Sequence, residues 1–120
     1  MKQGAQPAGL GARDSLRVEM GFCLYGHEIN DEISPLEARY WVFDWNMQGY
    51  VGADALKLKY IEGVKKIRLG FRMIGKSPIP RANSIVYVDN KKIGYVTSGS
   101  YSPILNKSIV LVSCTLAMQF

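Results

Sequence analysis

The chain has 120 residues, of which 48% are hydrophobic and 21% charged, and its formal net charge is +5. This length fits one domain or parts of two, and the composition is that of an ordinary globular protein rather than a disordered one. No apolar run approaches the roughly 18 residues of a membrane-spanning helix, and the first nine residues lack the apolar core of a signal peptide, so we expect a cytoplasmic chain.

The charge is unevenly distributed along the chain. Residues 1–56 carry four basic and eight acidic side chains, whereas residues 57–92 carry ten basic side chains against Glu62 and Asp89. A segment this basic favours an acidic partner, which could be a protein, a nucleic acid or a polyanionic ligand. A merely solvated face remains the alternative interpretation.

The first predicted element is an amphipathic helix between Asp14 and Gly26. Apolar residues recur at helical spacing along one stripe, which comprises Leu16, Met20, Cys23 and Leu24. Asp14 is the expected N-cap, because its carboxylate can accept from the free amides of the first turn. Arg13 is then expected just outside the positive end of the helix, where the amides and the guanidinium both favour an anion.

Three further elements are predicted before residue 64. Ser34, Pro35 and Glu37 form a capping box that begins a helix. Residues 40–43, Tyr-Trp-Val-Phe, are expected to form a short buried strand. Residues 53–62 have helical periodicity, and Gly63 is the expected C-terminal stop.

After Gly63 the period changes from nearly four to two. Residues 66–73 alternate basic and apolar side chains, which is typical of a strand with one wet face. Two β-branched runs joined at Asp89 and Asn90 predict a hairpin, since these residues tolerate positive φ. Residues 97–108 are expected to be a loop, and residues 109–118 a final strand. The predicted fold class is α+β, with an α/β core segment followed by an antiparallel barrel that these strands do not close.

Most motifs of enzyme chemistry cannot be built from this sequence. His27 is the single histidine, which excludes a histidine-based triad or multi-histidine metal site within the chain, and no metal ligands are predicted. The glycines before Arg13 do not form a dinucleotide fingerprint, because Asp14 occupies the third glycine position. Cys23 and Cys114 form no CxxC pair and are expected to be free thiols. No RNP-type motif accompanies the basic and aromatic residues of 60–95.

Four blocks of sequence, in order over residues 9–110, carry a family resemblance. They read GLGARDSLRVEMGFCLYGHEI, SPLEA, PIPR and IGYVTSGSYSPILNKSI. Together they resemble the T protein of the glycine cleavage system, a tetrahydrofolate-dependent aminomethyltransferase, in its C-terminal portion. The resemblance assigns residues 1–62 to the end of the folate-binding core domain and residues 63–120 to a truncated C-terminal β-barrel domain.

The resemblance implies a reaction, a cofactor and a partner. Such an enzyme takes the aminomethyl group from the lipoyl arm of the H protein, releases ammonia and forms methylenetetrahydrofolate. Arg13 matches the arginine that contacts tetrahydrofolate in this family, and a guanidinium suits the carboxylates or polar edge of a folate. Arg17, Glu19 and Tyr25 match the same motif and are expected to hold the helix in place. Ser98, Gly99, Ser102 and Pro103 match a barrel loop, where the glycine and proline are expected to shape the backbone.

The sequence also departs from the family pattern. The aspartate that the family uses as its catalytic carboxylate belongs to a long N-terminal part that this sequence does not contain, so no catalytic residue is assigned here and no turnover is expected from this chain alone. Where the family usually has histidine and glycine after PIPR, this chain has Ala82 and Asn83.

Two other interpretations remain open: the folate domain of a sarcosine or dimethylglycine dehydrogenase, and a non-catalytic basic barrel that docks an acidic carrier protein or RNA. The aminomethyltransferase interpretation expects the H protein and folate as partners, with no membrane or nucleic acid, and a mitochondrial location in a eukaryote.

Overall fold

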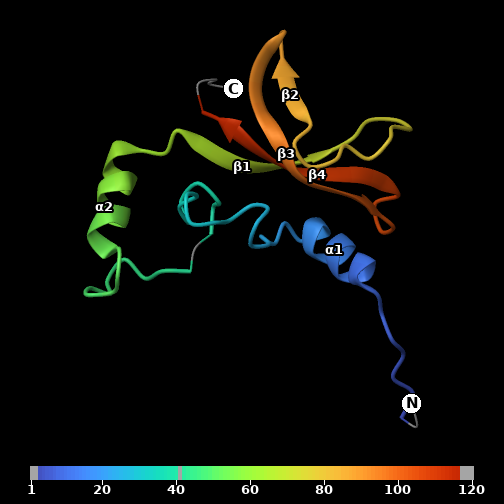
Figure 1. Ribbon diagram of the computed structural model, residues 1–120, viewed down its shortest axis with the longest axis horizontal. Coiled ribbons are helices and arrows are strands. Elements are labelled where there is room, and N and C mark those ends of the chain that lie inside the picture. Colours follow the sequence, from blue (N-terminus) through green and yellow to red (C-terminus); the bar gives the residue numbers. More distant parts are fainter. Residues whose placement is uncertain (1–2, 41, 117–120) are drawn as a thin grey trace.

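The computed structural model describes residues 3–40 and 42–116 and contains two helices and one antiparallel sheet. The elements are α1 (Leu10–Glu19), α2 (Ala53–Glu62), β1 (Lys66–Arg72), β2 (Ile85–Val88), β3 (Lys91–Ser102) and β4 (Lys107–Thr115). The strand order is β1-β4-β3-β2 (Figure 1). Helix α1 lies against one face of the sheet near β3 and β4, and α2 stands apart from it. The predicted α+β class is confirmed, and the sheet is open.

The sheet forms where the period-two pattern predicts it. Asp89 and Asn90, with φ of 49° and 61°, make the tight turn between β2 and β3. Strand β4 buries side chains on both faces: Val110, Val112 and Cys114 pack in one cluster, and Ile109 and Leu111 pack with Val18 of α1 in another. The core of the molecule is therefore this central strand, covered by α1 on one side.

The predicted loop over residues 97–108 is largely wrong. Strand β3 continues to Ser102, and only the short turn of residues 103–106 separates it from β4. The serines and glycines of this segment resemble a loop sequence. They are tolerated in a strand because the serine hydroxyls find partners outside the sheet and because Gly99 approaches another backbone segment. A Cβ on Gly99 would lie 1.9 Å from the carbonyl oxygen of Pro80.

Helix α1 begins five residues earlier than predicted and ends earlier too. Gly9, in an extended conformation, is the N-cap, so Arg13 lies inside the helix rather than just outside its positive end. Asp14 does not cap the helix; its carboxylate instead accepts from Arg17 one turn later. The chain leaves the helix at Met20 and turns at Gly21, whose φ is 68°, well before Gly26.

The segment between the helices is mostly irregular. The capping box of Ser34 and Glu37 is present, with reciprocal backbone-to-side-chain hydrogen bonds of 3.0 and 3.4 Å, but it supports one turn rather than a helix. Arg39, with φ of 54°, ends that turn. The predicted strand at residues 40–43 is absent from its described residues 40, 42 and 43; Trp41 lies outside the described part. Helix α2 and its stop at Gly63 agree with the prediction.

The chain is more extended than a compact domain of its length. Its radius of gyration is 17.1 Å, whereas a compact chain of this length has about 14 Å. The molecule is also flat, with extents of 49 × 47 × 20 Å. Within α2 only Ala53 is buried, so this helix contributes little to the core. No helix in the described ranges has the length and apolar character needed to cross a membrane.

Candidate functional site

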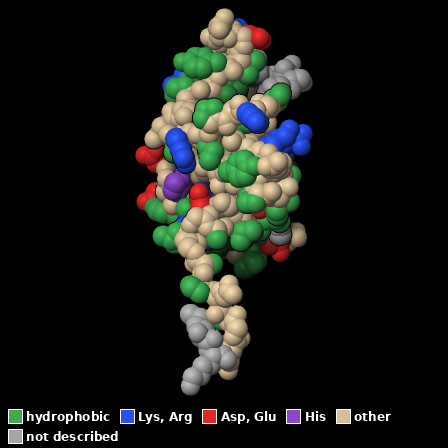
Figure 2. Space-filling view, turned by 90° about the vertical axis from the view of Figure 1, so that its right-hand side faces the viewer, with side chains coloured by type: hydrophobic (Ala, Val, Ile, Leu, Met, Phe, Trp, Pro, Cys, Tyr) green, Lys and Arg blue, Asp and Glu red, His purple; other side chains and the backbone are tan. Residues whose placement is uncertain are grey.

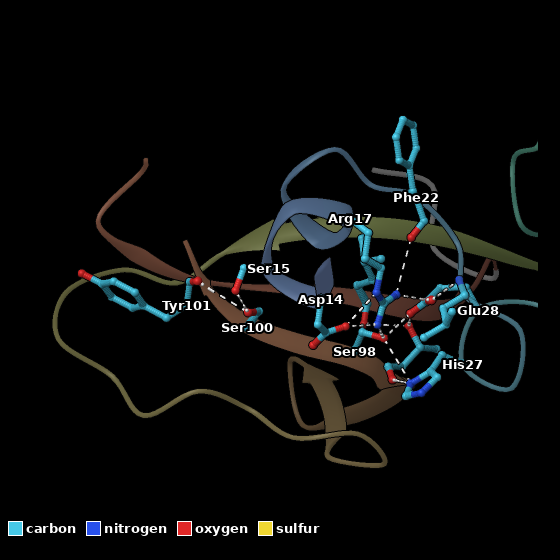
Figure 3. Close-up of polar contacts among 12 residues, drawn as sticks. Asp14, Ser15, Arg17, Phe22, His27, Glu28, Ser98, Ser100 and Tyr101 are labelled. Carbon is cyan, nitrogen blue, oxygen red and sulfur yellow. Dashed lines mark hydrogen bonds and ion pairs between the residues drawn. The ribbon is translucent and has the colours of Figure 1, made fainter. Parts of the chain in front are cut away.

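A buried polar cluster joins α1, the loop after it and strand β3 (Figure 3). Arg17 is at its centre, with its side chain 9% exposed. Its guanidinium donates to Asp14 at 2.8 Å, to Glu28 Oε2 at 2.7 Å and to Ser98 Oγ at 2.9 Å. The Glu28 side chain is fully buried and also accepts from the Leu24 amide at 3.1 Å. Arg17 and Glu28 therefore neutralise each other away from water.

A β-bulge explains how two consecutive side chains of β3 reach Glu28. The register with β4 shifts between Val96 and Ser98, which brings Thr97 and Ser98 to the same side of the strand. Their hydroxyls lie 2.7 and 2.5 Å from Glu28 Oε1. Since adjacent residues in a regular strand point to opposite faces, this double contact requires the irregularity.

Beyond the bulge, alternate serines of β3 continue the contact with α1. Ser100 lies 3.2 Å from the hydroxyl of Ser15, and the fully buried Ser102 donates to Glu19. Arg17 and Glu19 thus hold α1 against β3, as expected, whereas the Tyr25 hydroxyl donates to Asp31 on the surface. This interface positions the helix that carries Arg13.

Arg13 itself differs from Arg17 in every respect that bears on binding. It is exposed on α1, and it forms no hydrogen bond or ion pair of its side chain with another described residue. Because the donors of Arg17 are taken by Asp14, Glu28 and Ser98, its guanidinium has little left to offer a ligand, whereas that of Arg13 is free.

Titratable groups near the cluster do not point to a nucleophile. Both cysteines are free thiols, as predicted. Burial raises the pKa of Cys23, an effect that nearby Arg68 partly opposes, and burial also raises the pKa of Cys114. Raised thiol pKa values reduce the thiolate fraction near neutrality and disfavour nucleophilic chemistry. His27, on the surface beside acidic side chains (Figure 2), lies 3.3 Å from the Thr97 carbonyl oxygen. The described residues contain no cluster of ligands that could hold a metal ion.

Sequence reasoning missed the acid at the centre of this cluster. No sequence pattern singles out Glu28 or Thr97. The two hydroxyl groups that contact Glu28, those of Thr97 and Ser98, lie about 70 positions from it along the chain. No local signal marks Glu28 as buried, because Asn30, Asp31 and Glu32 follow it within four positions, and a buried carboxylate needs a cation. That cation is Arg17, which the sequence assigned to a structural role.

Comparison with protein families identifies both halves of the chain. Residues 1–46 match the GCVT N-terminal domain, and residues 66–114 match the glycine cleavage T-protein C-terminal barrel domain. The two matched segments meet in the structure through the contacts of α1 with β3 and β4. The polar cluster therefore lies between the segment matched by one domain family and the segment matched by the other.

Individual relatives agree with this assignment. An aminomethyltransferase of Thermoanaerobacter pseudethanolicus is 50% identical over 109 residues, and one of Mycobacterium avium is 45% identical over 109 residues. Each alignment covers 90% of this chain and 29% of the relative. The crystal structure of glycine cleavage system aminomethyltransferase T from Bartonella henselae superposes with a TM-score of 0.84 at 28% identity, covering 94% of this chain and 32% of that one. The chain thus spans about 29% of the length of its curated relatives, and it belongs to the glycine cleavage T-protein family of aminomethyltransferases.

Proposed function

We propose that this chain is part of an aminomethyltransferase that transfers a methylene group from the aminomethyl-lipoyl arm of the H protein to tetrahydrofolate, with release of ammonia. The proposal is supported by two domain families matched in one chain and by relatives of 45–50% identity named aminomethyltransferase. In it, residues 1–62 end the folate-binding core domain and residues 63–120 begin the C-terminal barrel domain. The reaction takes place in the cytoplasm, or in mitochondria in a eukaryote.

The free guanidinium of Arg13 supports a role in binding tetrahydrofolate. An exposed arginine that forms no ion pair with a described residue keeps its five donors for a ligand, and a carboxylate or polar ring edge is its natural partner. The buried network of Arg17, Glu28 and Ser98 fixes the helix beneath it. Tetrahydrofolate supplies the amine that accepts the methylene carbon, and Arg13 binds and orients the folate.

The chain contributes binding and scaffold rather than proton transfer. Glu28 is the one fully buried carboxylate in the cluster, and its charge is neutralised by Arg17 and by three further hydrogen bonds. A carboxylate held in this way has no free lone pair directed at a substrate. We therefore expect no turnover from this chain alone.

The exposed stripe of α1 supports the proposed position of residues 1–62 at the end of a larger core domain. Leu16 is 59% exposed and Met20 is 67% exposed, although their helical spacing is that of a buried face. Apolar stripes at this spacing normally pack against other elements. In the whole enzyme, further parts of the folate-binding core cover this stripe.

Thermal unfolding in the presence of tetrahydrofolate tests the folate assignment. Ligand binding to the native state raises the melting temperature, so saturating tetrahydrofolate should raise that of the parent chain. The rise should disappear in Arg13→Ala and persist in Arg81→Ala, which removes the same charge from another exposed site. A rise that survives in Arg13→Ala excludes this role for Arg13, and no rise in the parent chain excludes folate binding by this chain.

The basic segment after Gly63 supports the H protein as partner, since the lipoyl carriers of this family tend to be acidic. Lys65 and Lys66 are exposed and suited to docking. Arg68 is less suited, because it donates to the carbonyl oxygens of Ala38 and Gly21 and so holds the fold together. Reversing the charges of Lys65 and Lys66 should weaken binding of the lipoylated H protein at low salt, whereas reversing Lys91 and Lys92 should not; equal binding by both double variants excludes this surface.

A further inference from the structure

The first turn of α1, which carries Arg13, has little support of its own. Its N-cap is Gly9, which has no side chain to accept from the free amides, and no acidic residue lies in the turn. Gly11 also lies within it, where glycine stabilises a helix less than alanine does. Residues 10–13 are all exposed. The position of Arg13 therefore depends on contacts made further along the helix.

Two polar contacts connect the start of α1 to the sheet (Figure 3). The Asp14 carboxylate accepts from Arg17 at 2.8 Å, and the Arg17 guanidinium donates to Ser98 Oγ at 2.9 Å. The Ser15 hydroxyl lies 3.2 Å from that of Ser100. Both contacts end on β3, so a strand of the segment matched by the barrel family holds the turn that carries the proposed folate arginine.

The hydroxyl of Ser98 is shared between the two charges of the buried pair. It donates to Glu28 Oε1 at 2.5 Å and accepts from Arg17. Because a serine hydroxyl has one proton, its donation to Glu28 leaves the oxygen as the acceptor for Arg17. The neighbouring Thr97 hydroxyl contacts Glu28 and the Leu111 carbonyl oxygen, and within the described part of the chain it has no hydrogen bond to Arg17.

This path from β3 to α1 is shielded from water. Arg17, Glu28 and Ser98 are 9%, 3% and 4% exposed. A buried hydrogen bond is stronger than an exposed one, and water does not take the place of a lost partner. Removal of the Ser98 hydroxyl leaves the Arg17 guanidinium joined to its own helix and to Glu28, but no longer to the barrel strand. The path consists of contacts within the chain and does not depend on what covers its outer surface.

From these contacts we propose that Ser98, supported by Ser100, is a positioning residue for the folate site. Its hydroxyl sets the orientation of the first turn of α1 through Arg17 and Asp14, and thereby that of Arg13. This inference rests on the proposed role of Arg13 in binding tetrahydrofolate. Ser98 acts through α1 and is not itself a folate ligand. The affinity for tetrahydrofolate is therefore set in part by the barrel segment.

Calorimetric titration with tetrahydrofolate, well below the melting temperature, measures the effect on binding. Ser98→Ala should raise the dissociation constant by about fivefold or more, the lower end of the usual coupling between linked sites. Thr97→Val is the matched control, because it removes a hydroxyl from the same bulge and the same carboxylate while the Arg17 contact remains. It should change the dissociation constant by less than about twofold.

The comparison separates positioning from stability. A purely structural role would lower the melting temperatures of both variants and leave both dissociation constants unchanged, since circular dichroism verifies that each is folded during the titration. Equal constants for Ser98→Ala and the parent chain overturn the proposal. An equal rise in Thr97→Val does so too, because it assigns the effect to general loosening of the cluster. If Ser98→Ala does not fold, Ser100→Ala, at a half-buried position, takes its place.

Relaxation of ¹⁵N without folate distinguishes failure of the positioning role from failure of the folate site. The Arg13 amide of the parent chain should have an order parameter of about 0.85, that of rigid backbone. Ser98→Ala should lower it and shift the amide resonance, whereas Thr97→Val should not. Unchanged values in Ser98→Ala overturn the positioning role even where folate binds. Absence of tetrahydrofolate binding by the parent chain overturns the folate site instead, and the Arg13 amide then decides alone whether Ser98 positions it.

Discussion

The two helices of this chain are held in opposite ways. Helix α1 packs on the sheet through Val18 and through a buried network of Arg17, Glu28 and the serines of β3. Helix α2 buries only Ala53. It is held near the segment before it by Trp45, whose ring packs at a tilt against that of Tyr60 with a centroid separation of 4.7 Å, and by the Lys59–Glu37 ion pair. A segment with helical periodicity therefore forms a helix in both cases, but only α1 becomes part of the core.

The difference follows from where each helix finds partners. Helix α1 contacts side chains of strand β3, which lie about 80 residues away in the sequence. These contacts are shielded from solvent, so water does not compete for their hydrogen-bonding groups. Helix α2 meets mainly residues within about 25 positions of itself. Removal of single contacts should therefore be costly around α1 and mild around α2.

The largest expected effect is on the buried ion pair. Glu28→Ala leaves the Arg17 guanidinium without its main counter-charge and should lower the free energy of unfolding by about 3–5 kcal/mol. Glu32→Ala, on the same loop but exposed, should change it by less than about 0.5 kcal/mol. Urea denaturation of the two variants measures the contrast, and a loss below about 1 kcal/mol in Glu28→Ala would show that the pair does not hold α1 to the sheet.

A smaller effect is expected where β3 passes close to Pro80. Gly99→Ala forces a methyl group against the Pro80 carbonyl oxygen and should cost about 1–3 kcal/mol. Gly70→Ala is the matched control, because its methyl group has ordinary contact distances and should be neutral or stabilising by up to about 1 kcal/mol. Thermal unfolding compares the two, and equal stability would mean that the approach of β3 to Pro80 is readily relaxed.

Around α2 the expected effect is smaller still and local. Trp45→Ala removes aromatic contacts with Phe43 and Tyr60, which contribute about 0.5–1.5 kcal/mol each. Hydrogen exchange of the α2 amides should become faster while that of the β4 amides stays unchanged, because the two regions share few contacts. Faster exchange throughout β4 would show instead that α2 and the sheet unfold together.

The smallest effect concerns the thiol of Cys114. Burial raises its pKa above the ordinary value of 9.0, so the unfolded chain loses this proton at lower pH than the folded chain does. Stability from this group is therefore complete below about pH 9 and falls as pH rises toward the higher folded pKa. In Cys114→Ser the decline in unfolding free energy between pH 8 and pH 10 should be shallower, and an identical decline would assign it to other groups.

Local sequence rules correctly predicted the elements that depend on the conformational preferences of their own residues. The Asp89–Asn90 turn, the alternation in β1 and the stop at Gly63 follow from the conformational preferences of those residues, and the structure confirms them. The same rules were wrong for residues 97–102. Serine and glycine are typical of loops, and they form a strand here because the serines have partners on α1 and Gly99 lies against Pro80.

The site divides in the same way. The sequence alone determined the family through four ordered motifs, and it separated Arg13, a candidate for folate, from Arg17, a support for the helix. The tertiary structure decided that Arg17 is closed off by Glu28, that Arg13 lies inside α1 with its guanidinium free, and that Ser98 of β3 contacts Arg17. The physical reason is that turns and caps depend on neighbours in sequence, whereas the partners of a buried charge lie on segments that meet only when the chain folds.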